Sequence, residues 1–406
     1  MIKFALIKER KTPPDRRVVF SPQKLKEVVK KFPEANFKVE SSDIRIFSDQ
    51  EYRDARFEVS EDVSDCEVLL GVKEVPIPAL IPNKKYFFFS HTIKKQPYNR
   101  DLLREILRNN IELYDHEVII NERGARLIGF GRYAGLVGAY NCMRAIGLKE
   151  TGFNLPKAED LPDLNAMLSE LEKVEIPAYK FILTGSGKVA HGAKEILDHL
   201  KIKKVTPDAF LKEDFKVPVF CHLDVLDYAK RKDGKKGEVT DYYHHPENYE
   251  SNFLRFAAAA DVFIAGHFYG EGSPVFFTAE EAKKDNFNIK YVADISCDIA
   301  GPVASTIRPS TIAEPLYGYD PQRESEVDFR EKESICVMAV DNLPCELPKD
   351  ASEGFGEMFL ENVIPAFFNG DKDGVLERAR MTKDGKLTER FRYLEAFVNG
   401  EEIHEG

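Results

Sequence analysis

The sequence predicts an α/β protein built from two doubly wound domains with a cleft between them. Short apolar runs alternate along the chain with stretches whose apolar residues repeat every three or four positions, which is typical of parallel sheets covered by helices. A glycine-rich turn at residues 185–187 joins one such run directly to one such stretch. The length of 406 residues is sufficient for two or three domains with large buried cores.

The first part of the chain alternates between strand and helix patterns. Its expected elements are strand 2–7, a helix with apolar positions 25, 28, 29 and 32, strands 68–72 and 86–89, a helix with apolar positions 102, 103, 106 and 107, and strand 111–114. Residues 151–178 are rich in Leu, Pro and acidic residues and read as a linker between two lobes. Further strands are expected at 181–184, 261–265, 291–295 and 335–340, and the charged stretch 228–241 reads as a solvated loop.

The turn at 185–187 has the spacing of a dinucleotide-binding motif. Gly185 and Gly187 let backbone N–H groups approach a pyrophosphate, and Ala190 occupies the third small position. Val189 lies on the same helical face as apolar positions 193, 196, 197 and 200, so the turn opens an amphipathic helix. The alternative interpretation is a tight turn between two core elements. The candidate cofactor-binding residues here are Gly185, Ser186, Gly187, Lys188 and Val189.

Composition limits the partners. The sequence holds 69 acidic and 58 basic residues, a formal charge of −11, which argues against nucleic acid as the main partner. It has no apolar stretch of membrane-spanning length and no signal-peptide pattern at its start, so we expect a cytoplasmic protein that binds small molecules and no membrane. The six cysteines are scattered, and Cys297 is read as a buried thiol rather than a nucleophile. No particular oligomeric state is indicated.

Three titratable residues follow predicted strands closely. Lys73 comes directly after run 68–72, His91 follows 86–89 after one residue, and Glu117 lies three residues beyond Tyr114. Because ligands of open parallel sheets gather at the carboxyl ends of the strands, we expect these side chains to share one site. Arg17 and Arg126 lie near the same edge and could clamp a substrate carboxylate. Taken singly, each of these residues is equally explained by an exposed amine, a core histidine or a surface ion pair.

These residues belong to segments that resemble a known family. Segments 17–22, 71–74 and 89–94 are similar to the N-terminal domain shared by alanine dehydrogenase, proton-translocating transhydrogenase and lysine-forming saccharopine dehydrogenase. Longer segments narrow the resemblance to the lysine–2-oxoglutarate reductase half of aminoadipic semialdehyde synthase. They are 87–94, 129–135, 242–252, 294–298 and 341–344.

The resemblance implies two Rossmann-like domains and their order. Residues 1–137 would form a substrate domain, 138–310 a dinucleotide-binding domain that includes the linker 151–178, and 311–406 a return to the substrate domain. It also implies NAD(P)-dependent interconversion of saccharopine with L-lysine and 2-oxoglutarate. The bifunctional relatives carry a saccharopine-cleaving half that is not found in this sequence, so the next step is expected in another protein.

The resemblance assigns roles residue by residue. Lys73 matches the acid–base lysine, and His91 matches the histidine that orients substrate and assists proton transfer. Glu74 and Glu117 match carboxylates that tune the site and hold the amine partner. The clamps for the glutarate portion correspond to Arg17 and Arg126, and Asp298 corresponds to the aspartate close to the nicotinamide. No metal is required, and the adjacent His244 and His245 point in different directions, so no metal site is expected.

The sequence is compatible with either NAD or NADP as the cofactor. Asp208 follows a predicted second strand and could bind the ribose hydroxyls of NAD, whereas Lys203 and Lys204 could receive the 2′-phosphate of NADP, and Asp208 could instead be a helix N-cap. Two alternative functions stay open. One is another amino-acid dehydrogenase such as alanine dehydrogenase, and the other is a dinucleotide-binding sensor without turnover.

Overall fold

The computed structural model describes residues 1–401, which divide into two compact units. The first unit comprises Met1–Phe130 together with the chain from Pro348 onward, and the second comprises Gly131–Leu347. The sequence analysis placed the return to the first unit at residue 311. The structure places it at Pro348, because strands between residues 316 and 338 pair within the second sheet.

The first unit contains a six-stranded sheet in the order β3-β2-β1-β4-β5-β6, and all its strand pairs are parallel. Its strands are β1 (Ile2–Leu6), β2 (Ala35–Glu40), β3 (Glu58–Ser60), β4 (Val68–Leu70), β5 (Lys85–Phe88) and β6 (Glu112–Asp115). The strand order reverses between β1 and β4, so the sheet is doubly wound and has its switch point there.

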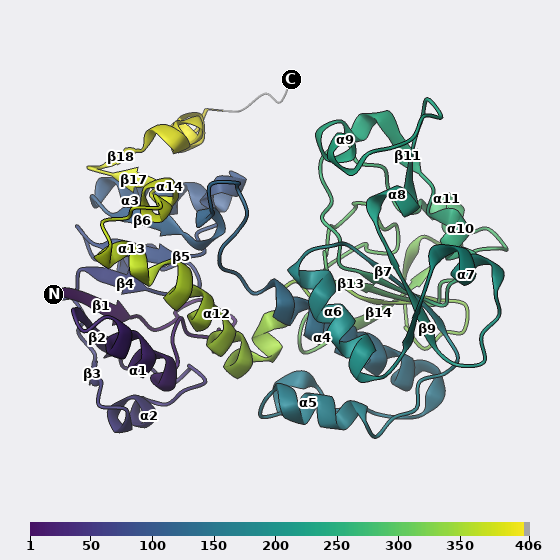
Figure 1. Cartoon of the computed structure of the whole chain (residues 1–406), viewed down its shortest axis with the longest axis horizontal. Coiled ribbons are helices and arrows are strands. Elements are labelled where there is room, and N and C mark those ends of the chain that lie inside the picture. Colours follow the sequence, from purple (N-terminus) through teal and green to yellow (C-terminus); the bar gives the residue numbers. More distant parts are fainter. Residues whose placement is uncertain (402–406) are drawn as a thin grey trace. The chain divides into compact units, whose positions relative to one another are not determined.

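Helices cover both faces of the first sheet (Figure 1). One face packs against α1 (Pro22–Lys31), α12 (Pro348–Asn362), α13 (Ile364–Phe368) and α14 (Val375–Ala379), and the other packs against α3 (Arg100–Arg108) and α15 (Glu395–Asn399). A short helix, α2 (Asp49–Asp54), follows β2. Alternate residues of β1 serve the two faces, since Phe4 and Leu6 lie in one cluster and Ala5 and Ile7 in the other.

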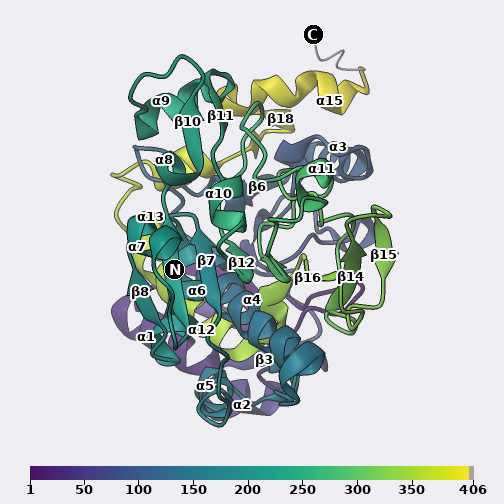
Figure 2. The ribbon, with the colours of Figure 1, turned by 90° about the vertical axis from the view of Figure 1, so that its right-hand side faces the viewer.

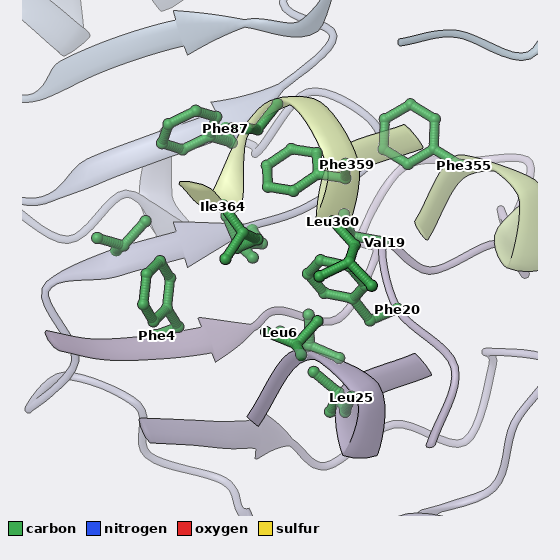
Figure 3. Packing of buried hydrophobic residues seen from close by; sticks show 14 of the residues in the cluster. Phe4, Leu6, Val19, Phe20, Leu25, Phe87, Phe355, Phe359, Leu360 and Ile364 are labelled. Atoms are coloured by element: carbon green, nitrogen blue, oxygen red, sulfur yellow. The ribbon is translucent and has the colours of Figure 1, made fainter. Parts of the chain in front are cut away.

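The C-terminal segment is an integral part of this core. Figure 3 shows Phe359, Leu360 and Ile364 pointing toward Phe4 and Leu6 on the sheet. Beyond α14, short strands β17 (Thr382–Lys383) and β18 (Lys386–Leu387) lie next to β6, where the Met381 N–H donates to Leu113 O at 2.8 Å. The return therefore supplies apolar surface that the N-terminal part lacks.

The second unit contains an eight-stranded sheet in the order β15-β14-β16-β13-β12-β7-β9-β8 (Figure 2). In this sheet β14 is antiparallel to both of its neighbours, β15 and β16, while the other strand pairs are parallel, and the order reverses between β7 and β12. The strands are β7 (Lys180–Thr184), β8 (Lys203–Val205), β9 (Val219–Leu223), β12 (Val262–Ala265), β13 (Tyr291–Asp294), β14 (Leu316–Asp320), β15 (Ser325–Val327) and β16 (Ile335–Met338).

Two helices of this unit, α4 (Gly131–Ile146) and α6 (Lys188–His199), pack unusually closely. A Cβ atom at Gly135 would lie 1.9 Å from Val189 O, and one at Gly192 would lie 2.0 Å from Arg132 O, so only glycine fits at either position. The remaining helices are α5 (Leu164–Leu171), α7 (Pro207–Lys212), α8 (Val225–Tyr228), α9 (Val239–His244), α10 (Leu254–Ala257) and α11 (Ala279–Ala282).

The fold class is as predicted, but two segments differ from their predicted state. Residues 151–178 contain α5 and lie inside the second unit rather than between the units. The charged stretch 228–241 is partly ordered, because β10 (Ala229–Arg231) pairs with β11 (Tyr249–Ser251) and Arg231 forms ion pairs with Asp233 and Asp241. Across residues 1–401, the helices are too short or too polar to cross a membrane.

Candidate functional site

A buried carboxyl group fixes the turn that carries Lys73. Glu9, just beyond β1, accepts the N–H of Val72 at 2.7 Å and the N–H of Lys73 at 2.8 Å. Behind the same turn, the Nε2–H of His116 donates to Gly71 O at 2.8 Å. Burial lowers the pKa of His116 to about 4, which keeps this imidazole neutral. The backbone from Gly71 to Lys73 is therefore held on two sides at the switch point between β1 and β4.

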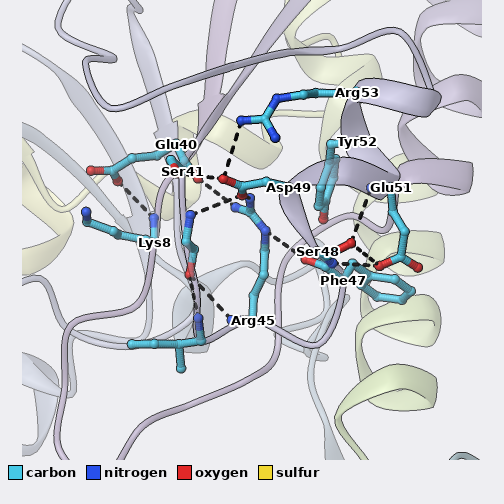
Figure 4. A network of polar contacts seen from close by, with 12 residues as sticks. Lys8, Glu40, Ser41, Arg45, Phe47, Ser48, Asp49, Glu51, Tyr52 and Arg53 are labelled. Atoms are coloured by element: carbon cyan, nitrogen blue, oxygen red, sulfur yellow. Dashed lines mark hydrogen bonds and ion pairs between the residues drawn. The ribbon is translucent and has the colours of Figure 1, made fainter.

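A polar network joins Lys8, the residue before Glu9, to the chain around the end of β2 (Figure 4). Glu40 accepts the Lys8 N–H at 2.9 Å, and the buried Arg45 donates to Glu40 O at 2.7 Å and Phe47 O at 3.0 Å while pairing with Asp49. The buried guanidinium of Arg45 uses its donors on the end of β2 and the segment that follows it, because a buried donor must be satisfied locally. The bond between Lys8 and Glu40 ties the chain after β1, directly before Glu9, to the end of the neighbouring strand β2.

A second buried carboxyl group, Asp115 at the end of β6, fixes His91 and Glu117. It accepts the Ser90 N–H at 2.9 Å, the Ser90 hydroxyl and the Glu117 N–H at 2.7 Å. His91 follows in the left-handed region at φ 55°, an uncommon conformation for this residue. Asp115 thereby brings the ends of β5 and β6 together, and the Nδ1 of His91 lies 3.6 Å from Glu117 Oε2.

Burial dominates the titration of these two anchoring groups. It raises the pKa of Glu9 to about 8, with the charge of nearby Asp15 adding to the effect. Burial also raises the pKa of Asp115, outweighing the hydrogen bonds from Ser90 and Glu117 that favour its charged form. Both carboxyl groups therefore spend a wider pH range protonated than exposed ones do.

Glu117 differs from Glu9 and Asp115 because its pKa is lowered rather than raised. Burial alone would raise its pKa, but the contact with His91 and the charges of Lys94 and Arg126 hold the pKa below its usual value. The Nζ of Lys94 and the NH2 of Arg126 lie 3.7 and 3.6 Å from Glu117 Oε1. Glu117 is accordingly an ionised carboxylate among cations.

The two predicted arginine clamps have different surroundings. Arg17 is buried and forms a bidentate pair with Asp15, with Nε–Oδ1 at 3.0 Å and NH2–Oδ2 at 2.6 Å, and its guanidinium lies over the Phe130 ring. The edge of the Arg17 guanidinium formed by Nε and NH2, which could bind a substrate carboxylate, therefore binds the carboxylate of Asp15. Arg126 has a side chain that is 57% exposed and borders Glu117, so it is the more accessible of the two.

Lys73 lies near the ion pair of Arg17 and Asp15, and its neighbour Glu74 pairs with Lys11. The positive charges of Arg17 and, more weakly, Lys73 lower the pKa of Asp15 against the opposing effect of burial. Glu74 is buried and pairs with Lys11 through Oε2, while its Oε1 makes no hydrogen bond within residues 1–401. The predicted residues Lys73, Glu74, His91 and Glu117 thus all lie on turns at the carboxyl ends of β4, β5 and β6.

In the second unit the glycine turn lies at the switch point between β7 and β12. Gly185 has φ +98°, and a Cβ there would be 2.3 Å from Gly266 O, so the turn passes directly over the end of β12. A Cβ at Gly187 would meet nothing within 4 Å. Gly187 is the N-cap of α6, and the first N–H groups of a helix have no acceptor within the helix. A close backbone turn, open space and a helix N-terminus together fit a dinucleotide pyrophosphate.

The predicted ribose-binding carboxylate, Asp208, does not lie beside the glycine turn. Asp208 follows β8, the outermost strand of the sheet, where it lies in the first turn of α7 behind the N-cap Thr206 and pairs with Lys212. The strand next to β7 is β9, which occurs later in the chain, and the exposed Asp224 follows it directly. Asp224 is therefore the carboxylate at the position that contacts ribose in doubly wound folds.

Three further residues at this edge escaped the sequence analysis. The Nε2–H of His222 donates to Gly185 O at 2.6 Å, and His267 Nδ1 lies 2.9 Å from the Thr184 hydroxyl. Burial lowers the pKa of His267 to about 3. Tyr243, on α9, is half exposed and interacts with the Ser186 side chain. No motif in the sequence indicates these contacts, since the residues come from separate strands and a helix.

Asp298 and Cys297 lie on the loop after β13. Burial raises the pKa of the half-buried Asp298, and it raises the pKa of the Cys297 thiol to about 12. The Cys297 thiol donates to Ala339 O at 3.1 Å, which agrees with a structural rather than nucleophilic role. Among residues 1–401 no group of His, Cys, Asp and Glu has a metal-binding arrangement.

Comparisons with known proteins confirm the resemblance that the motifs indicated. Residues 5–137 match the family described as alanine dehydrogenase/PNT, N-terminal domain. Alpha-aminoadipic semialdehyde synthases of Arabidopsis thaliana and Mus musculus are 29% and 28% identical over 88% and 94% of this chain. The chain spans 37% and 46% of the length of these two relatives.

A relative of similar length is saccharopine dehydrogenase [NAD(+), L-lysine-forming] of Yarrowia lipolytica, 27% identical over 89% of this chain and 92% of that protein. Among solved structures, an L-alanine dehydrogenase aligns with a TM-score of 0.66 at 15% identity over 98% of this chain and 100% of that chain. A transhydrogenase from Sinorhizobium meliloti aligns with a TM-score of 0.56 at 14% identity over 95% of this chain and 98% of that chain. The two structures share the fold of this chain.

The anchoring role of Glu9 predicts a pH-dependent stability. Because the folded-state pKa is raised, Glu9 binds a proton in the folded chain at pH values where the unfolded chain has lost it, and its contribution declines as pH rises from 4.5 to about 8. Glu9→Gln cannot ionise, so the melting temperature of the native protein relative to this variant should fall across that window. Glu34→Gln, which removes an exposed carboxylate, is the control. Parallel pH profiles for the native protein and Glu9→Gln would contradict the assignment.

Proposed function

We propose that this chain is an NAD(P)-dependent oxidoreductase that interconverts saccharopine with L-lysine and 2-oxoglutarate. The observation that carries the proposal is the convergence of Lys73, Glu74, His91 and Glu117 on three adjacent strand ends of the first unit. The glycine turn of the second unit supports dinucleotide binding, and the names of the full-length relatives support the choice of substrates.

The side chains present are sufficient for the proton transfers of such a reaction. Forming the carbon–nitrogen bond requires a proton to leave the ε-amine of lysine and a proton to reach the departing keto oxygen, and Lys73 is the proposed acid–base group. The Nδ1 of His91 and the Oε2 of Glu117 lie 3.6 Å apart, and the two side chains together can hold the amine partner. A bound nicotinamide nucleotide supplies the hydride chemistry, and no residue of the chain needs to carry electrons.

The position of Asp224 supports NAD as the preferred cofactor. A carboxylate at the end of the strand beside the glycine turn accepts hydrogen bonds from ribose hydroxyls and repels a 2′-phosphate. Lys203 and Lys204, which sequence analysis offered as a phosphate site, lie on the edge strand β8, one strand further away.

A substrate panel tests the reaction. Initial rates with lysine, alanine and ammonia against 2-oxoglutarate and pyruvate, followed by oxidation of the reduced nicotinamide, should show turnover of lysine with 2-oxoglutarate above every other pair. Efficient use of pyruvate with ammonia instead would favour an alanine dehydrogenase-like enzyme. Cofactor binding without turnover of any pair would favour a sensor.

Removing the proposed acid–base group should separate chemistry from cofactor binding. Lys73→Met keeps the length of the side chain and removes its amine, so turnover should fall by about two to four orders of magnitude. The affinity for NAD, measured by fluorescence titration, should be unchanged because the glycine turn belongs to the other unit. Lys383→Met, at an exposed lysine of the first unit, is the matched control. Near-native turnover in Lys73→Met would refute the role.

The two candidate ribose carboxylates make a matched pair. Asp224→Asn removes the charge but keeps a side chain that can cap α8, so the unit should stay folded. We expect the Kd for NAD to rise about tenfold or more and the preference over NADP to shrink, because a charge-assisted hydrogen bond is lost. Asp208→Asn should leave both constants unchanged. An equal effect of the two substitutions, or an effect of Asp208→Asn alone, would place the ribose elsewhere.

A further inference from the structure

A pocket of about 440 Å³ lies in the first unit beside Glu117. Its walls come from two distant parts of the sequence, the turn after β6 and the C-terminal segment. The lining residues are Glu117, Val118, Ile120, Gly124, Arg126, Arg390, Phe391 and Tyr393. Sequence analysis selected Glu117 and Arg126 but no residue of the C-terminal segment.

The pocket holds more positive than negative charge. Glu117 is its single acidic lining residue, and two arginines line it as well. The side chain of Glu117 is only 7% exposed, yet its Oε2 makes no hydrogen bond within residues 1–401. His91 and the cations Lys94 and Arg126 have nitrogen atoms 3.6–3.7 Å from the Glu117 carboxylate oxygens, beyond hydrogen-bond distance. Because Glu117 and its neighbouring cations are not in direct hydrogen-bond contact, the cations can accept an anionic group of a ligand and Glu117 can accept an amino group.

Arg390 is held in place by its neighbours in the chain. The 3₁₀ segment η9 (Glu389–Leu394) is anchored in the core by Phe391 and Leu394, which are buried against the face of the sheet that α3 covers. Arg390 lies on the exposed side of η9 and forms no ion pair or hydrogen bond with the residues that the structure describes. Arg392, two residues further on, is instead paired with Glu389. The anchored backbone of η9 thus places Arg390 in the lining of the pocket, and its guanidinium is available to a ligand.

We propose that Arg390 and Arg126 together bind a carboxylate of a small amino or keto dicarboxylic acid, with Tyr393 completing the wall. Two guanidinium forks that line the same pocket match one planar carboxylate, and the Glu117 carboxylate in that pocket matches an amino group. The C-terminal segment is then a specificity element of the substrate site as well as part of the core. The identity of the acid rests on the proposed function, whereas the anion-binding role of Arg390 does not.

Binding of 2-oxoglutarate, glutarate and saccharopine to the full chain, measured by isothermal titration calorimetry, tests the pocket. Arg390→Ala should weaken dicarboxylate binding about tenfold to a hundredfold, since a charge-assisted contact is lost. Arg390→Lys keeps the charge without the fork and should give an intermediate Kd. Arg392→Ala, on the same segment and already paired with Glu389, should bind like the native chain. Unchanged binding in Arg390→Ala and Arg390→Lys would overturn the proposal, as would equal losses in Arg390→Ala and Arg392→Ala.

Kinetics separate this inference from the proposed function. If the native chain turns over lysine with 2-oxoglutarate, Arg390→Ala should raise the KM for a dicarboxylic substrate with a smaller effect on kcat, because Arg390 binds rather than reacts. Native turnover with unchanged KM and Kd in Arg390→Ala would leave the function standing and overturn the pocket. Absence of turnover in the native chain, together with loss of dicarboxylate binding in Arg390→Ala, would overturn the function and support the pocket.

Discussion

Buried carboxyl groups that accept backbone N–H bonds hold the candidate active-site turns of the first unit. Glu9 binds the N–H groups of Val72 and Lys73, and Asp115 binds those of Ser90 and Glu117. Strand ends leave donors without ladder partners, and an unpaired buried N–H costs free energy. Satisfying these donors with carboxyl oxygens fixes the turns, and the same burial shifts the titration of the anchors. Positioning of the functional side chains and their electrostatic environment therefore have one physical origin.

Both units use the same topological device with different chemistry. In each, the strand order reverses beside the first strand of the sheet, between β1 and β4 and between β7 and β12. The first unit fills this switch point with charged and titratable turns. The second leaves open space at Gly187, where a Cβ would meet no atom within 4 Å, and its Gly185 passes directly over Gly266. Charge suits a reacting polar substrate, whereas open space beside a helix N-terminus suits a phosphate.

The C-terminal return has a structural and a proposed functional role. Its Phe359 and Ile364 pack on one face of the first sheet, and its Phe391 and Leu394 pack on the other. Because these apolar side chains fix the segment to the sheet, the polar residues between them are fixed as well. Arg390 and Tyr393 consequently reach the Glu117 pocket although more than 260 residues separate them from it in the sequence. A core contact thus determines which residues can meet a ligand.

The sequence by itself determined the α/β class, the main buried strands, the glycine turn and the residues Lys73, His91 and Glu117, because apolar periodicity and motif spacing are local properties of the chain. Tertiary structure alone decided which strands are neighbours. Because β9 rather than β8 lies beside β7, the carboxylate at the strand end next to the glycine turn is Asp224 and not Asp208. Because residues 316–338 stay in the second sheet, the chain returns to the first unit at Pro348. The bidentate pairing of Arg17 with Asp15 and the arrival of Arg390 beside Glu117 were likewise decided by the fold. Strand order and contacts between distant segments depend on burying whole faces of a sheet, and that free energy is not encoded in any short stretch of residues.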